Sequence, residues 1–213
     1  MISKVHPLTT LLLLCCLVQP CIAQRMLHDD SKLREGDLLF VVAPAANAIT
    51  DVTTGIDAQP IDHVGIYHIE KGGAVVIEAN YDGVVETPFS CFLQHSPYLL
   101  VGRVTGRVDI QESIKNARSH LGKSYDHVYQ QDDDAIYCSE LVQKSYVDKE
   151  GRLLFSPIGM SFHDADGQIL PYWEDFYSRR ALDVPEGQPG SNPGDLSRRK
   201  NVKIKYRLTP IAK

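Results

Sequence analysis

Two neighbouring segments rich in β-branched residues constrain the fold of this chain more than any other feature of the sequence. The segments "DHVGIYHIE" (62–70) and "GAVVIEAN" (73–80) are separated by a Gly-containing turn at 71–73, a pattern typical of a β-hairpin. The apolar run "GDLLFVV" (36–42) predicts a buried strand before the hairpin, and "GVVETPF" and "YLLVGRV" predict further strands after it. The sequence therefore predicts a mostly antiparallel sheet.

Helical periodicity follows the predicted strands. The segment 109–123 has apolar residues at helical spacing, with Asp109 as the expected N-cap and Gly122 as the expected end of the helix. A second helix is predicted to begin near Cys138, and "PYWEDFYSRRAL" (171–182) predicts a third. Helices packed against such a sheet make an α+β fold.

The last part of the chain predicts a Pro- and Gly-rich loop at 185–194 and then a terminal strand, "NVKIKYRL". Neither an internal repeat nor a long linker interrupts the order of the elements. We therefore expect a single domain over residues 24–213.

The N-terminal residues 1–23 have the features of a signal peptide. Lys4 is followed by an apolar run (8–18) that is too short to span a bilayer, and no later segment has the length of a membrane helix. We therefore expect an exported chain, periplasmic or extracellular, without a transmembrane segment. A lipoprotein anchor at Cys15 or Cys21 is the alternative, but neither residue follows the small residues that such a processing site requires.

Cysteine content and charge exclude two classes of protein. Only Cys91 and Cys138 remain after the signal peptide, which permits one disulfide and does not resemble a disulfide-rich scaffold. Loss of Lys4 changes the formal net charge from −5 to −6, and a negative chain is poorly suited to bind the phosphates of nucleic acids. The basic segment "SRRKNVKIKYR" is interpreted as a solvated edge strand that its Lys and Arg side chains protect.

Cys138 allows two interpretations. Leu141, Val142 and Ser145 follow it at helical spacing, so the thiol faces the core side, as a buried structural cysteine does. The start of a helix also offers unpaired N–H groups and the positive end of the helix dipole. Because these features activate a thiol and can hold an oxyanion, Cys138 is a candidate nucleophile if it lies at a cleft.

A thiolate nucleophile usually has a histidine partner, and His63 is the favoured candidate because it opens an apolar strand. His68 is odd-spaced from His63 and faces the opposite side of the sheet, which disfavours a two-histidine metal site on this strand. His127 precedes the cysteine helix and is a second candidate. The other histidines of the mature chain are interpreted as surface residues: His28, His95, His120 and His163.

Glu78 is an acid inside the apolar run "VVIEA". If the hairpin loop has an even number of residues, His63 and Glu78 share a face of the sheet. A four-residue loop at 69–72 sets them directly opposite each other, whereas a tight turn at 72–73 pairs Tyr67 with the acid. A buried carboxylate requires donors nearby, so an imidazole partner is one interpretation and an exposed glutamate at a strand end is the other.

Five motifs, in chain order, resemble those of one enzyme family. The motifs "GDLLF", "HVGIY", "VIEAN" followed by "GV", "LGKSYD" and "YCSELV" are similar to those of the YiiX/YebB-like cysteine hydrolases. These enzymes are the circularly permuted branch of the NlpC superfamily and have a papain-like fold. The resemblance extends from about Gly36 to Leu208. Permutation places the histidine before the cysteine, as His63 and Cys138 are here.

The resemblance implies a role for each candidate residue. Cys138 would be the nucleophile, His63 its base and Glu78 the residue that orients the imidazole. The Cys138 N–H would help to hold the oxyanion, with either Tyr137 or Tyr125 as a second donor; each tyrosine could equally be a packing residue. No metal ion or organic cofactor is implied.

The resemblance leaves the acyl group open. Our first hypothesis is an exported, monomeric enzyme that cleaves amides of small peptides or amino acids, including peptides derived from cell walls. The second is a lipid amide or ester hydrolase, or an acyltransferase similar to lecithin:retinol acyltransferase. The third is a binding module without catalysis, in which a disulfide between Cys91 and Cys138 blocks the thiol; otherwise Cys91 is structural. Long loops at 49–59, 157–167 and 185–194 are expected to line the cleft.

Overall fold

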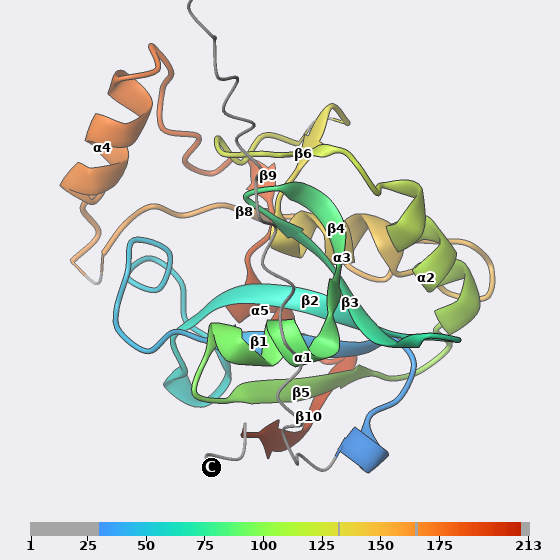
Figure 1. Cartoon of the computed structure of the whole chain (residues 1–213). Coiled ribbons are helices and arrows are strands. Elements are labelled where there is room, and N and C mark those ends of the chain that lie inside the picture. The colour runs from blue at the N-terminus through green and yellow to red at the C-terminus, as the bar shows by residue number, and fades with distance from the viewer. Residues whose placement is uncertain (1–29, 132, 165, 210–213) are drawn as a thin grey trace, which may run out of the picture.

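A six-stranded antiparallel sheet forms the centre of the computed structural model, which describes residues 30–131, 133–164 and 166–209 (Figure 1). The predicted signal peptide at 1–23 lies outside these residues. The strands lie in the order β10-β5-β1-β2-β3-β4. Their bounds are β1 (Asp37–Val42), β2 (Ile61–Glu70), β3 (Gly73–Asn80), β4 (Gly83–Pro88), β5 (Leu99–Val104) and β10 (Val202–Leu208).

Short helices and strand pairs surround this sheet. The α-helices are α1 (Phe89–Phe92), α2 (Ile110–Ser119), α3 (Cys138–Ser145), α4 (Pro171–Ser178) and α5 (Pro193–Arg198). The 3-10 helices are η1 (Asp30–Lys32), η2 (Ile56–Ala58) and η3 (Leu93–His95). The strand pairs are β6 (Ser124–Tyr125) with β7 (Ala135–Ile136), and β8 (Ile158–Gly159) with β9 (Pro189–Gly190).

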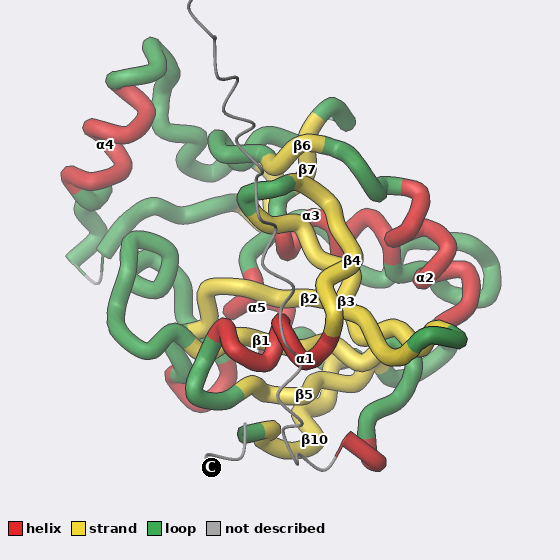
Figure 2. Tube along the Cα trace, viewed as in Figure 1, coloured by secondary structure: helices red, strands yellow, loops and turns green. Residues whose placement is uncertain are grey.

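Each face of the sheet has its own apolar core. Figure 2 shows α1 over one face, where Phe89 and Phe92 pack with Leu39 and Val76. On the other face α3 contacts β2, β3, α2 and α5, and Leu141 and Val142 join the main core. A third, smaller core holds α4, which lies apart from the sheet at the upper left of Figure 1. The expected sheet packed by helices is confirmed.

The helix predictions are correct in position and too long in extent. Asp109 caps α2 by accepting a hydrogen bond from the Glu112 N–H at 3.1 Å, as predicted, but the helix ends at Ser119 rather than Gly122. Similarly, α4 ends four residues before Leu182. Within the described ranges, no helix combines the length and the apolar composition needed to cross a membrane.

The prediction of a loop over residues 185–194 is wrong for its second half. It contains strand β9, and α5 begins at Pro193. Asn192 accepts a hydrogen bond from the Asp195 N–H at 2.6 Å, and a proline suits the first position of a helix because its missing N–H has no partner there. The Pro193–Gly194 pair predicts a loop, but the preceding Asn192 makes the pair the start of a helix.

The hairpin register lies between the two registers considered from the sequence. Glu70 pairs with Gly73 and Ile66 with Ile77, so the turn comprises Lys71 and Gly72. Extending this register by one residue places Gly65 opposite Glu78. Glu78 is therefore diagonal to His63, and the predicted sharing of one face is retained.

A β-bulge interrupts the pairing of β1 with β2 beside His63. Val41 pairs with His63 but Val42 pairs with Ile61, so Asp62 is an extra residue in β2. A bulge redirects side chains at the end of a strand. As a result Ile61 is fully buried in the main core, whereas both Asp62 and His63 line a cavity.

We predict that Gly65→Ala destabilises the fold by about 1–3 kcal/mol, because it overpacks the space between β3 and α1. An added Cβ would lie 3.1 Å from Phe92 Cε2 and even closer to Val76 Cγ1, a stiff β-branched side chain. The free energy of unfolding in urea measures the effect. Gly72→Ala is the matched control, since its Cβ would meet no atom within 4 Å. Equal stability of the two variants would contradict the prediction.

Candidate active site

His63, Glu78 and Cys138 meet at one end of the hairpin, where β2 and β3 approach the start of α3. His63 Nε2 lies 2.6 Å from Glu78 Oε2. The imidazole also hydrogen-bonds the Cys138 thiol, for which Nδ1 is the remaining ring nitrogen. The structure thus brings all three predicted residues into one chain of contacts. The His63 side chain is 18% exposed and that of Glu78 is fully buried.

The buried Glu78 carboxylate has two partners. Besides His63, it accepts a hydrogen bond at Oε1 from the Thr87 hydroxyl on β4. Burial opposes its ionisation, but the bonds to His63 and Thr87 outweigh this and lower the pKa of Glu78. Thr87 was not predicted as a site residue. Strand alternation could have identified it, because Glu78 pairs with Val85 and Thr87 lies two residues further along the same face.

The imidazole of His63 is held in its charged form. Burial disfavours the proton, but the hydrogen bonds to Cys138 and Glu78 and the negative charges of both groups raise the pKa of His63 to about 10. At neutral pH, His63 is therefore an imidazolium between a carboxylate and a sulfur atom.

Cys138 is the first residue of α3 and is 6% exposed. It is a free thiol, so the disulfide with Cys91 that would block it does not form. Leu141 and Val142 on the same helix are fully buried in the main core, as helical spacing predicted. The position thus combines a core-facing helix with a cavity wall, since Cys138 also lines the cavity.

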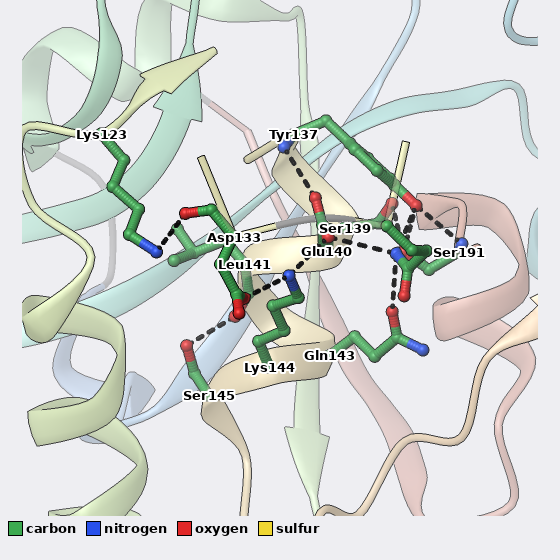
Figure 3. A network of polar contacts seen from close by, with 11 residues as sticks. Lys123, Asp133, Tyr137, Ser139, Glu140, Leu141, Gln143, Lys144, Ser145 and Ser191 are labelled. Carbon is green, nitrogen blue, oxygen red and sulfur yellow. Dashed lines mark hydrogen bonds and ion pairs between the residues drawn. The ribbon is translucent and has the colours of Figure 1, made fainter. Parts of the chain in front are cut away.

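The two candidate oxyanion tyrosines lie in different environments. The Tyr137 hydroxyl accepts hydrogen bonds from the Ser191 N–H at 3.0 Å and from Gln131 Nε2 at 3.2 Å, and its side chain is buried (Figure 3). Tyr125 is half-buried and hydrogen-bonds Tyr129. Burial and the negative charge of Cys138 raise the pKa of Tyr125 far above its ordinary value, so the phenol stays protonated beside the sulfur.

Tyr129 is a site residue that the sequence did not indicate. Its backbone has a φ of 56°, in the left-handed region that non-glycine residues seldom adopt. Its ring packs at right angles to those of Tyr137, at 5.3 Å, and Trp173, at 5.9 Å. These contacts hold the segment between β6 and β7 against the cavity.

The cavity has a volume of about 830 Å³, and loops supply much of its wall. The predicted loop segments contribute as expected: Ile49 and Val52 from the first, Met160 and Phe162 from the second, and Ser191 from the third. Its charged side chains are acidic or histidine, and no Lys or Arg is among the described residues that line it.

One wall of the cavity is apolar. Met160, Phe162 and Trp173 of the third core face it, together with Ile49 and Val52, which pack against that core. The Trp173 indole donates a hydrogen bond to the Ala48 carbonyl at 3.2 Å, which ties α4 to the loop after β1. Asp62 also lines the cavity and accepts a hydrogen bond from Asn47 at 2.7 Å.

His95 lies closer to the candidate site than its sequence context indicated. It is exposed, but its ring centroid is 6.3 Å from that of His63 and 4.9 Å from that of Phe92. Burial and the positive charge of His63 lower the pKa of His95, although Glu78 opposes this. The other candidate, His127, stacks on Tyr81 at 5.8 Å and is not part of the His63–Glu78–Cys138 group.

The described residues contain one cluster with the donor atoms of a metal site. His68, Glu70 and Glu86 have ligand atoms within 4.8 Å of one another. Arg118 lies among them, 3.0 Å from each of the two carboxylates and 3.3 Å from His68 Nε2. Because a guanidinium already pairs with both carboxylates, the cluster fits a protein ion-pair network better than a metal ion.

Comparison with known proteins agrees with this geometry. The family model for the permuted papain-like amidase enzymes YaeF/YiiX, of the C92 family, matches residues 32–200. The chain belongs to this family. The predicted YiiX-like, permuted papain-like fold is confirmed.

Two relatives of this amidase family are informative. Over 117 residues the chain is 30% identical to the uncharacterized protein YiiX of Escherichia coli (strain K12), in a match that covers 52% of this chain and 56% of that protein. The chain thus spans little more than half the length of that curated relative. The crystal structure of the metalloprotein YiiX from Escherichia coli O157:H7 has a TM-score of 0.68 at 22% identity, covering 83% of this chain and 98% of that one.

We predict that Glu78→Gln shifts the titration of His63 to lower pH, because it removes the carboxylate that helps to raise the pKa to about 10. NMR of the imidazole nitrogens measures the shift. Glu86→Gln, which alters a carboxylate paired with Arg118 instead, is the matched control. An unchanged titration of His63 in the Glu78 variant would contradict the prediction.

Protonation of His63 also contributes to the free energy of unfolding. The folded chain binds this proton more tightly than the unfolded chain, in which the imidazole has its ordinary value of 6.5. The stabilisation is therefore complete below about pH 6.5 and is lost as the pH rises through about 10.

Proposed function

We propose that this amidase-family enzyme cleaves amide bonds through a Cys138–His63–Glu78 triad. The observation that carries the proposal is the unbroken chain of contacts from the buried Glu78 carboxylate through His63 to the thiol, at the wall of the cavity. A thiolate beside an imidazolium is the nucleophilic form of a cysteine hydrolase.

In the proposed mechanism the Cys138 thiolate attacks the carbonyl carbon of the amide and the carbonyl oxygen becomes an oxyanion. His63 then donates its Nδ1 proton to the leaving nitrogen, the C–N bond breaks, and the acyl group remains on sulfur as a thioester. The neutral imidazole next takes a proton from water, the hydroxide attacks the thioester, and the acid leaves. Glu78 keeps the ring oriented in both steps.

We assign the oxyanion to the Cys138 N–H, at the start of α3, and to the Tyr125 hydroxyl. The N–H of a first helical residue has no partner within its helix. Tyr125 is favoured over Tyr137 because the negative charge of Cys138 is among the main influences on the Tyr125 phenol and not among those on the Tyr137 phenol.

The charge of the cavity favours neutral or amine-bearing substrates. Its acids include Asp62 and Asp82, without Lys or Arg among the described lining residues. Apart from the His63 imidazolium, a substrate carboxylate would lack a cationic partner among these residues. Amides of small peptides or amino acids fit this environment when the groups near Asp62 are neutral or positively charged.

The apolar wall favours a second candidate substrate class, amides or esters with a hydrophobic acyl chain. Burying apolar substrate surface against Phe162, Trp173 and Ile49 contributes about 25 cal/mol per Å². A catalytically inactive binding module is the less favoured reading, because Cys138 is a free thiol and its histidine is charged.

The structural neighbour is described as a metalloprotein. Among the residues that the structure describes, those whose donor atoms cluster as a metal site requires are His68, Glu70 and Glu86, and Arg118 already pairs with both acids. These residues therefore do not fit a metal ion, and the proposed mechanism does not use one. We further propose that the enzyme is exported, on the basis of the signal-peptide features of residues 1–23.

The first test is alkylation of Cys138 by iodoacetamide across pH, with the site assigned by mass spectrometry. We expect rapid labelling below neutral pH, and a loss of about 100-fold in His63→Ala, because the imidazolium holds the thiolate. His68→Ala is the matched control, since its Nδ1 bonds Glu35 at the same 2.6 Å but on the other face of β2. Ordinary thiol reactivity in all three proteins would refute the triad.

The second test compares acyl groups. We expect Ile49→Ala to lower kcat/KM for a long-chain acyl amide about tenfold more than for the acetyl amide, because it removes three carbons of apolar wall. Leu182→Ala, which does not line the cavity, is the control. An equal effect on both substrates would place the acyl chain elsewhere.

A further inference from the structure

Glu140 is a fully buried acid two residues after Cys138, and the proposed mechanism does not use it. Its carboxylate faces back toward the start of α3 (Figure 3). There it accepts a hydrogen bond from the Tyr137 N–H, at 3.4 Å. A glutamate at the third helical position that bonds the N-cap N–H is half of a capping box. This acid therefore holds the residue immediately before the nucleophile.

Two side chains from outside the first turn of α3 bind the Glu140 carboxylate. Lys144 Nζ lies 2.9 Å from Glu140 Oε1, and Gln131 Nε2 donates to the same oxygen at 3.2 Å. Gln131 also donates to the Tyr137 hydroxyl at 3.2 Å. The backbone and the ring of Tyr137 are thus both connected to Glu140.

The residues on both sides of Cys138 are anchored to one serine. The Ser191 N–H donates to the Tyr137 hydroxyl, and the Ser191 hydroxyl donates to that of Ser139 at 3.0 Å. Movement of Tyr137 would therefore move the Cys138 N–H and thiol relative to His63. A small displacement of a reacting group slows the reaction strongly, since a shift of about 1 Å can reduce the rate about 100-fold.

The charge of Glu140 is balanced within the network. Lys144 compensates it and also pairs with the exposed Asp133 at 3.0 Å, while Asp126 and the Tyr137 phenol are the other titratable groups around it. Burial raises the pKa of Glu140 to about 7, with Lys144 opposing the shift and Asp126 adding to it.

We propose that Glu140 is a positioning residue of the reaction: its carboxylate, held by Lys144 and Gln131, fixes the first turn of α3 so that the Cys138 thiol and N–H stay aligned with His63. The inference rests on the proposed role of Cys138 as the nucleophile. Deprotonation of Glu140 completes the cap, so the reactivity of Cys138 rises as this acid ionises.

The test is the pH profile of Cys138 alkylation by iodoacetamide in the wild type, Glu140→Gln and Lys144→Met. In the wild type we expect a step near pH 7, the value of Glu140, distinct from His63 at about 10. In Glu140→Gln we expect no step, and above about pH 7 the alkylation of Cys138 is about tenfold slower than in the wild type, because the helix cap is weakened. Lys144→Met moves the step to higher pH, because the acid loses its compensating charge.

The matched controls are Glu112→Gln and Lys115→Met, which alter an exposed pair of the same 2.9 Å length on α2 and leave the profile unchanged. Circular dichroism checks the fold of each variant. If Glu140→Gln does not fold, the inference is tested by whether the step in Lys144→Met moves to higher pH. A wild-type profile that is retained in both network variants overturns the inference while leaving the triad intact. Ordinary reactivity of wild-type Cys138 at every pH overturns the triad itself.

Discussion

The hydrogen bond between His63 and Glu78 organises the candidate site, and several features of the fold serve to make it. A buried carboxylate is tolerated only with donors, which here are an imidazole and the Thr87 hydroxyl from the next strand. The two side chains share a face because the hairpin turn has two residues. Gly65 keeps the strand close to Val76 and Phe92 beside this pair. Thus the interior of the sheet, rather than a flexible loop, sets the orientation of the ring that faces the thiol.

Much of the sheet could be predicted from the sequence, because its strands are long apolar runs with clear turns between them. The strand at 73–80 has the predicted bounds, and the strands at 62–70 and 36–42 differ by one residue. The register could not be predicted, since it depends on which residues of the Lys-Gly-Gly segment form the turn. The helix α5 was missed because its stability depends on Leu196 reaching a core built from distant segments.

The main residues of the candidate site could be predicted from the sequence, but the residues that support them could not. The local motifs around Cys138, His63 and Glu78 indicated these residues, and their alternation placed two of them on one face. The supporting residues could not be found in this way. Thr87 requires the pairing of β3 with β4, and the Tyr137 hydroxyl is held by Ser191, which is 54 residues away from Tyr137 in the sequence. The nearness of His95 to His63 follows from the position of η3 relative to β2. Contacts between segments, not segment propensities, decide these details.

The left-handed backbone of Tyr129 links the apolar wall to the reacting sulfur thermodynamically. A non-glycine residue in that region costs about 1–3 kcal/mol, which its surroundings must offset. The offset comes from the rings of Tyr137, the N-cap of α3, and Trp173, on α4, and from the hydrogen bond to Tyr125. The apolar wall thus reaches the surroundings of the thiol through side-chain contacts alone, from Trp173 to Tyr129 and from Tyr129 to Tyr125 beside Cys138.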